Sequence, residues 1–125
     1  MPPRRRTDPV VGRAALAVWR DDPQAVPLAE RRAAVRFTLE ELAEVAPGHT
    51  VEVRVPPDGA VQAVEGPRHT RGTPPNVVET DPQTWLALVT GAIGWEQAVA
   101  EGRVRASGER ADLRPWLPLQ AARPR

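Results

Sequence analysis

The spacing of apolar residues changes abruptly at Pro47-Gly48. Before this dipeptide, apolar residues recur every three to four positions, which is the period of one face of an amphipathic helix. After it, Val51, Val53 and Val55 alternate with charged residues, which is the period of a strand with one buried face. The chain is therefore expected to combine helices and strands around one core.

The same patterns predict the other elements. Asp8-Pro9 and Asp81-Pro82 each join a helix-capping side chain to a proline suited to a first helical turn, and Gly91 is a natural helix terminator. The predicted helices, with the apolar residues expected to be buried, are 9–20 (Val11, Ala15, Val18), 28–46 (Leu28, Val35, Leu39, Leu42, Ala46), one from Pro82 (Trp85, Leu88, Val89, Ala92), 95–101 (Trp95, Ala98, Val99) and a last turn or two within 109–119 (Leu113, Trp116, Leu117). The predicted strands are 51–55, 60–65, 76–80 and 103–107. This order predicts an α+β fold, a mainly antiparallel sheet covered by helices.

Length and charge limit the class of protein. The chain has 125 residues, the size of one domain, which we expect at 8–119, with 1–7 as a mobile basic tail and 120–125 as a mobile C-terminal tail. The 17 basic and 16 acidic residues nearly cancel, so no nucleic-acid partner is expected. No apolar run has the length of a membrane span or signal peptide, so no integral membrane association is expected. The exclusive use of Arg as the basic residue, in an Ala- and Pro-rich chain, indicates a bacterial source, and the expected location is cytoplasmic.

Residues used for catalysis and metal binding are scarce. The chain has no cysteine, and its only serine, Ser107, lacks the Gly-x-Ser-x-Gly nucleophile motif. His49 and His69 are separated by the predicted hairpin and form no metal-binding spacing. Glu40 and Glu44 lie one turn apart on the polar side of a predicted helix, which is typical of a solvated face. The sequence therefore predicts a protein that is not an enzyme and has no metal and no cofactor.

The run DPQTWLALVTGAIGWEQAVAEGRVRASGERADLRPWLPL, Asp81 to Leu119, resembles the sterol carrier protein type 2 family. The resemblance lies in order and spacing: an Asp that opens a helix, a Gly that closes it, a second short helix, a Gly-x-Val-x-x-x-Gly strand and a Leu-rich last helix. The small bacterial branch of sterol carrier family proteins also shares the hairpin and GPRHTRGTPPNVVETD, so the resemblance covers roughly Asp8 to Leu119. The chain is also similar to the C-terminal domain of mycothiol-dependent maleylpyruvate isomerase-like enzymes, without the metal-binding helical bundle that precedes that domain.

The sterol carrier resemblance implies a sheet covered on one side by helices that enclose an apolar tunnel. Such a tunnel binds a lipid or another hydrophobic small molecule without covalent chemistry. The apolar candidates to line it are Phe37, Leu39, Trp85, Leu88, Val89, Trp95, Val99, Trp116 and Leu117. The same residues also suit the ordinary packed core of a small domain.

The isomerase resemblance implies an alternative function. The chain would then be an interaction or accessory module with a filled core, an exposed apolar patch and a protein partner in place of a ligand. In that case Trp19 or Trp116 is expected at the surface.

The stretch Gly66 to Pro82 is open to two interpretations. As a ligand mouth, Arg68, His69, Thr70 and Arg71 would hold a carboxylate or phosphate head group, since arginine forks suit both anions. As a stiff connector, its glycines and prolines would only turn the chain and lead it in extended form into the next strand. Sequence reasoning leaves both open.

Overall fold

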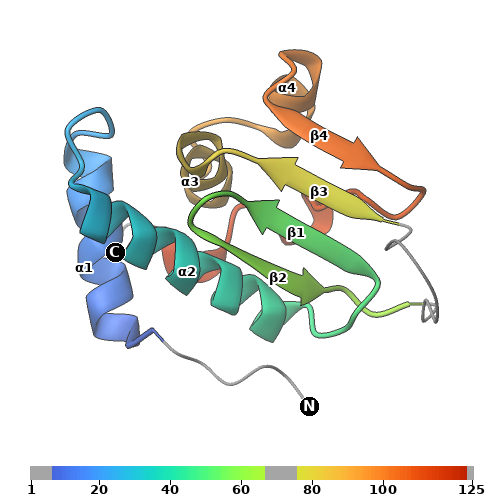
Figure 1. The fold of residues 1–125 in the computed structure, drawn as a ribbon, viewed down its shortest axis with the longest axis horizontal. Coiled ribbons are helices and arrows are strands. Elements are labelled where there is room, and N and C mark those ends of the chain that lie inside the picture. Colours follow the sequence, from blue (N-terminus) through green and yellow to red (C-terminus); the bar gives the residue numbers. More distant parts are fainter. Residues whose placement is uncertain (1–6, 67–75, 124–125) are drawn as a thin grey trace.

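The computed structural model describes residues 7–66 and 76–123. Figure 1 shows a sheet of four strands in this part of the chain, with α1 and α2 at one side and α4 beyond β4. The elements are α1 (Pro9–Asp21), α2 (Leu28–Val45), β1 (Val51–Val55), β2 (Gly59–Ala63), β3 (Val77–Thr80), α3 (Pro82–Thr90), α4 (Trp95–Ala100), β4 (Val104–Ser107) and two short 3-10 helices, η1 (Arg114–Trp116) and η2 (Gln120–Ala122).

The sheet has the strand order β2-β1-β3-β4. β1 and β2 form an antiparallel hairpin with Val53 opposite Val61, and β3 and β4 form a second antiparallel pair with Val78 opposite Ala106. β1 and β3 pair in parallel, so the sheet is mixed and mostly antiparallel. The predicted α+β fold class is confirmed.

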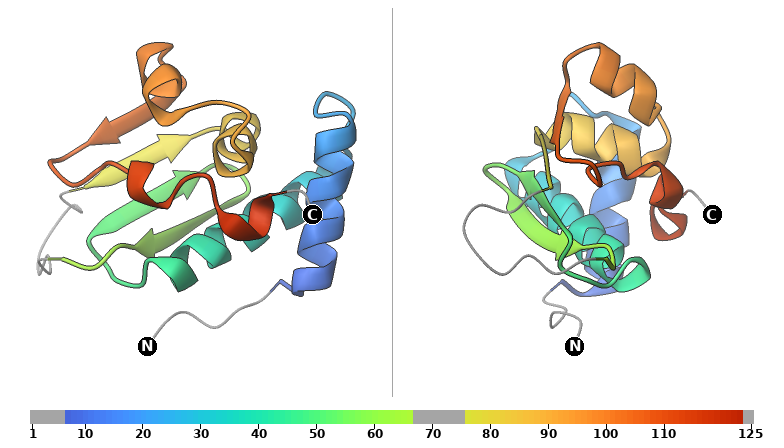
Figure 2. Two further views of the ribbon diagram at one scale, coloured as in Figure 1. Left: turned by 180° about the vertical axis from the view of Figure 1, so that it is seen from behind. Right: turned by 90° about the vertical axis from the view of Figure 1, so that its right-hand side faces the viewer.

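The sheet separates an apolar core from a charged outer face. In Figure 2, α2, α3 and the C-terminal segment all lie on one side of the sheet. Val51, Val53 and Val55 are fully buried on β1. Their neighbours Glu52 and Arg54 lie in alternating positions on the same strand and form an ion pair, with Arg54 Nε 2.5 Å from Glu52 Oε1. The period-2 pattern of the sequence is therefore the pattern of burial.

The helix boundaries follow the local signals in the sequence. Asp8 caps α1 by accepting a hydrogen bond from the amide of Val10, and Asp81 caps α3 by accepting one from the amide of Thr84, each at 2.8 Å. α3 ends at Gly91, which has the left-handed φ of 84° that favours glycine. The predicted helix starts and the predicted stop are confirmed.

The packing of α1 corrects one sequence prediction. The buried residues of α1 are Gly12, Ala15, Leu16 and Trp19. Val11 and Val18, expected on the buried stripe with Ala15, are instead 53% and 41% exposed. Both sides of this helix are apolar, so spacing alone does not identify the buried one. Close packing does: a Cβ on Gly12 would lie 2.2 Å from the Phe37 ring of α2, so α1 meets α2 at a residue without a side chain.

Outside the C-terminal segment, where Trp116 and Leu117 are half-buried, four other residues differ from the expected burial. Leu28, in the first turn of α2, is 50% exposed, and Ala92 is exposed because the chain leaves α3 at Gly91. On α4, which has only one buried residue, Ala98, the side chain of Trp95 is half-buried and Val99 is 41% exposed. A helix of this length presents only one narrow side to its neighbours.

The C-terminal segment also differs from expectation. The last helical turn or two predicted within 109–119 is present only as the short 3-10 helix η1, because Pro115 and Pro118 lack the amide hydrogens that a regular helix needs. The prediction that 120–125 would not dock is wrong for η2, whose Ala122 is fully buried and accepts a hydrogen bond from the Arg20 guanidinium through its carbonyl. At the other end, the amide of Thr7 donates to Glu40. Residues 1–6 and 124–125 lie outside the described part of the chain.

Candidate functional site

A pocket of about 370 Å³ lies between the end of α3, the start of α4 and the C-terminal segment. The residues that line it are Leu88, Gly91, Ile93, Gly94, Trp95, Glu96, Gln97, Arg114, Leu117 and Pro118. We call it the α3–α4 pocket. Its mainly apolar wall with a few polar groups is the usual make-up of a small-molecule site.

Local backbone structure shapes the α3–α4 pocket. After the turn at Gly91, the amide of Ile93 donates to the carbonyl of Ala87 at 3.2 Å, which folds the chain back onto α3. Gly94 then begins α4, and a Cβ built on it would meet no atom within 4 Å. The opposite wall is fixed because the amide of Leu119 donates to the carbonyl of Val89 at 2.9 Å. The pocket therefore lies where three short, hydrogen-bonded segments meet.

Arg114, the one cation among the described residues that line the α3–α4 pocket, is paired. Arg114 Nη1 lies 2.6 Å from Glu96 Oε1, and Arg114 Nη2 lies 2.7 Å from Asp112 Oδ2. These hydrogen bonds, first to Asp112 and then to Glu96, raise the pKa of Arg114, and the bond from Arg114 lowers the pKa of Asp112. With its charge balanced by two carboxylates, Arg114 makes a polar but not strongly cationic rim, which suits a neutral or weakly polar ligand.

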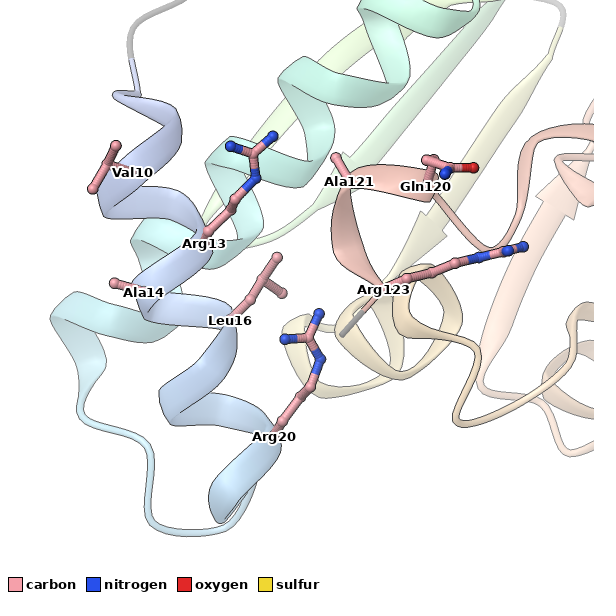
Figure 3. A pocket seen from close by; sticks show the side chains of 8 residues that line it. All are labelled: Val10, Arg13, Ala14, Leu16, Arg20, Gln120, Ala121 and Arg123. Atoms are coloured by element: carbon pink, nitrogen blue, oxygen red, sulfur yellow. The ribbon is translucent and has the colours of Figure 1, made fainter. Parts of the chain in front are cut away.

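A second, larger groove of about 760 Å³ lies between α1 and η2 (Figure 3). Its lining residues are Val10, Arg13, Ala14, Leu16, Arg20, Gln120, Ala121 and Arg123. We call it the α1–η2 groove. Among residues 7–66 and 76–123, three arginines line it and no aspartate or glutamate does.

The structure distributes the predicted cavity residues over three environments. Leu88, Trp95 and Leu117 come together in the α3–α4 pocket. Four others are closely packed in the core, with exposed fractions of 3% or less: Phe37, Leu39, Trp85 and Val89. Trp116 is half-buried and packs against the core, while Val99 lies outside the residues that line either hollow. Whether any of the nine contacts a ligand stays a prediction.

Two pocket residues, Ile93 and Pro118, were missed by sequence reasoning. Both lie just beyond the end of a helix: Ile93 lies between Gly91 and Gly94, after α3, and Pro118 follows η1. The available signal was Ile93 in Gly91-Ala92-Ile93-Gly94, because a large apolar side chain in a tight turn is buried only if it packs against a neighbouring segment. The α1–η2 groove had no such signal, since its two sides are about a hundred residues apart in sequence.

The head-group candidates Arg68, His69, Thr70 and Arg71 lie outside the described residues. Of that stretch, the structure describes its two flanks. Asn76 is buried: its side-chain amide donates to the carbonyl of Thr50 at 3.1 Å, and its side-chain oxygen accepts from the amide of Arg110 at 2.9 Å. The last residue before β3 is thus fixed to β1 and to the C-terminal segment.

His49 and Ser107, which form no catalytic motif in the sequence, also lie apart in the structure. His49 Nδ1 is 2.6 Å from Gln62 Oε1 on the exposed side of the hairpin, and Ser107 is exposed at the end of β4. In residues 7–66 and 76–123, no three His, Asp or Glu side chains are grouped closely enough to hold a metal ion. No helix of the described chain is both long and apolar enough to cross a membrane.

Comparison with protein families gives one match. Residues 28–119 match a family model described as "Bacterial SCP ortholog". A search of curated proteins finds no match. Every residue that lines the α3–α4 pocket falls within the matched span, and every residue that lines the α1–η2 groove falls outside it.

Proposed function

The chain belongs to the family of bacterial sterol carrier protein orthologues, and from this membership we propose that it binds a lipid or lipid-like hydrophobic molecule without covalent chemistry. The observation that carries the proposal is the α3–α4 pocket, which lies within the family span and has an apolar wall of Leu88, Ile93, Trp95, Leu117 and Pro118. Its volume falls in the range of roughly 300–1,000 Å³ that is usual for small-molecule sites.

The driving force for this binding would be the removal of apolar ligand surface from water. Each Å² removed contributes about 25 cal/mol, so a ligand that fills the pocket with hydrocarbon gains several kcal/mol before the entropy of binding is subtracted. Trp95 and Leu117 are only partly buried in the free protein, so they retain surface that a ligand can cover. The balanced charge around Arg114 supports a neutral or weakly polar ligand in this pocket.

The proposal treats the protein as a carrier rather than an enzyme. It requires no general base, nucleophile, metal or cofactor. The cytoplasmic location expected from the sequence stays a prediction.

The first test is native mass spectrometry of freshly purified protein, followed by solvent extraction and identification of any adduct. A second test is titration with 1-dodecanol, a neutral long-chain probe, followed by amide NMR. We expect the largest shift changes at Ile93, Gly94 and Leu117. An apo mass together with no shift change in this pocket at saturating dodecanol would reject the proposal.

Matched variants locate the site. Leu117→Gln places a polar group in the wall of the α3–α4 pocket, whereas Val99→Gln makes the same kind of change on the exposed side of α4. We expect Leu117→Gln to weaken dodecanol binding by tenfold or more, because burying a leucine side chain contributes about 1.5–3 kcal/mol. Val99→Gln should bind as the wild type does. Equal binding by both variants would exclude this pocket as the site.

The alternative function, an interaction module, is favoured by a different observation. Val10, Val11 and Val18 on α1 are 74%, 53% and 41% exposed, which is an outward apolar surface. The specific expectation for that function was an exposed Trp19 or Trp116, and Trp19 is 5% exposed while Trp116 is half-buried. A protein that binds no dodecanol and co-purifies with a stoichiometric protein partner would favour this alternative over the carrier.

A further inference from the structure

The α1–η2 groove is formed by the two ends of the chain. α1 supplies Val10, Arg13, Ala14, Leu16 and Arg20, and the segment at η2 supplies the other side. In Figure 3, the side chains of Arg13 and Arg20 extend from the side of α1 that faces η2. η2 is held in place by the burial of Ala122 and by the hydrogen bond from the Arg20 guanidinium to the Ala122 carbonyl. The groove is therefore a product of tertiary docking.

The arginines of the groove lack the acidic partners that other arginines have. Arg31, Arg54 and Arg114 each form an ion pair with a carboxylate at 2.8 Å or less. Within residues 7–66 and 76–123, no ion pair involves Arg13, Arg20 or Arg123. Figure 3 shows that the guanidinium groups of Arg13 and Arg20 extend on the side of α1 that faces the hollow, whereas the Arg123 side chain extends away from α1. Two guanidinium groups without an ion-paired carboxylate in residues 7–66 and 76–123 favour the entry of an anion.

Arg20 carries a second sign of an incomplete site. Its Nε is buried and has no hydrogen-bond partner in the described part of the chain. A buried donor without an acceptor is uncommon in folded proteins because the donor has lost its water. Burial also lowers the pKa of Arg20, since the charged form is less well solvated there. An anionic oxygen beside this guanidinium would supply the missing interaction.

The remainder of the groove is apolar. Leu16 is fully buried at its base, and Val10, Ala14 and Ala121 complete this part of the lining. An inorganic anion would use only the arginines, whereas an amphiphilic anion would use both parts. Planar guanidinium groups bind carboxylate and phosphate equally well in geometric terms.

We infer that the α1–η2 groove is a second ligand site, which binds an organic anion, carboxylate or phosphate, that carries an alkyl chain. This site is separate from the α3–α4 pocket and does not depend on it. The anionic group lies beside Arg13 and Arg20, and the alkyl chain lies over Leu16 and its apolar neighbours.

The test uses decanoate, decyl phosphate, 1-decanol and inorganic phosphate as probes, measured by calorimetry and by amide NMR on the full chain. We expect both alkyl anions to shift the amides of residues 10–20 and 120–123 and to bind at least tenfold more tightly than either decanol or inorganic phosphate. Whichever of decanoate and decyl phosphate binds more tightly shows whether the site prefers a carboxylate or a phosphate group. Binding of inorganic phosphate as tight as that of the alkyl anions would overturn the amphiphile assignment.

Charge-matched variants complete the test. Arg13→Gln removes an exposed groove cation, and Arg110→Gln removes an exposed cation elsewhere. The groove variant should lose at least tenfold in decanoate affinity, which corresponds to about 1.4 kcal/mol, and the control should change less than twofold. Because both residues are exposed, both variants should keep the wild-type melting temperature. Equal decanoate affinities for the two variants would refute the α1–η2 site. An unchanged dodecanol response at Ile93 and Gly94 in the groove variant would show that the α3–α4 pocket does not depend on that result.

Discussion

Asp58 in the turn between β1 and β2 accepts two hydrogen bonds from the guanidinium of Arg31 on α2, at 2.8 and 2.9 Å. The Asp58 side chain is fully buried, while the Arg31 side chain is 25% exposed. Arg36 adds a hydrogen bond from its Nε to the main-chain carbonyl of Asp58 at 3.2 Å. The hydrogen bond to Asp58 raises the pKa of Arg31. This pair attaches the hairpin to the helix that covers it.

Replacement of Asp58 by Asn is therefore expected to destabilise the fold. The variant keeps the shape of the side chain but loses the charge-assisted pair, and we expect the free energy of unfolding to fall by about 2 kcal/mol. Urea denaturation measures the change. The control is Glu79→Gln, which removes an ion pair with the largely exposed Arg105 and should cost no more than about 0.5 kcal/mol. A loss at Asp58 as small as that of the control would show that the pair does not hold the hairpin.

The indole of Trp85 is satisfied inside the core by one hydroxyl group. Its Nε1 donates to Thr38 Oγ1 at 2.8 Å, and both residues are fully buried. Thr38→Val keeps the shape but leaves the indole N–H without an acceptor, so we expect a loss of about 1–3 kcal/mol in unfolding free energy. Thr38→Ser keeps the acceptor and removes one methyl group, with an expected loss of about 0.8 kcal/mol. If thermal or urea unfolding finds the Ser variant less stable than the Val variant, the hydrogen bond is not the important contact.

The pair of Asp112 and Arg114 predicts a small pH dependence of stability. The hydrogen bond from Arg114 lowers the pKa of Asp112 in the folded state. Because the folded pKa is below the unfolded one, of about 3.9, the pair stabilises the protein fully above that pH, and the contribution is lost as the pH falls through the lowered pKa. The Asp112 side chain is 40% exposed, so the effect should be less than about 1 kcal/mol.

Urea unfolding at about pH 6 and about pH 3 tests whether this pair makes the free energy of unfolding fall as the pH is lowered. Asp112→Asn should lose less stability than the wild type between the two pH values. Asp21→Asn, at the exposed end of α1, serves as the control and should retain the wild-type pH dependence. A wild-type pH dependence in the Asp112 variant would contradict the assignment.

Much of the fold was predictable because its signals are local. The caps at Asp8 and Asp81 and the stop at Gly91 act through neighbouring backbone groups, so a short stretch of sequence contains the whole interaction. The alternation in Val51–Val55 likewise reports which side of one strand is apolar. The order and spacing of these signals carried the family resemblance in the sequence, and the family model matches residues 28–119.

The rest was decided by packing between distant segments. The close packing of Gly12 against Phe37 shows which apolar side of α1 is buried, and the hydrogen bond from Arg20 to Ala122, with the burial of Ala122, holds η2 in place. Both hollows lie where separate segments meet without filling the space between them. The sequence by itself determined α1 to α4, the four strands to within two residues and the α+β class, because each of those follows from residues a few positions apart. The tertiary structure alone decided which apolar side chains line a hollow and which fill the core, because a hollow is the space that several elements together leave unfilled.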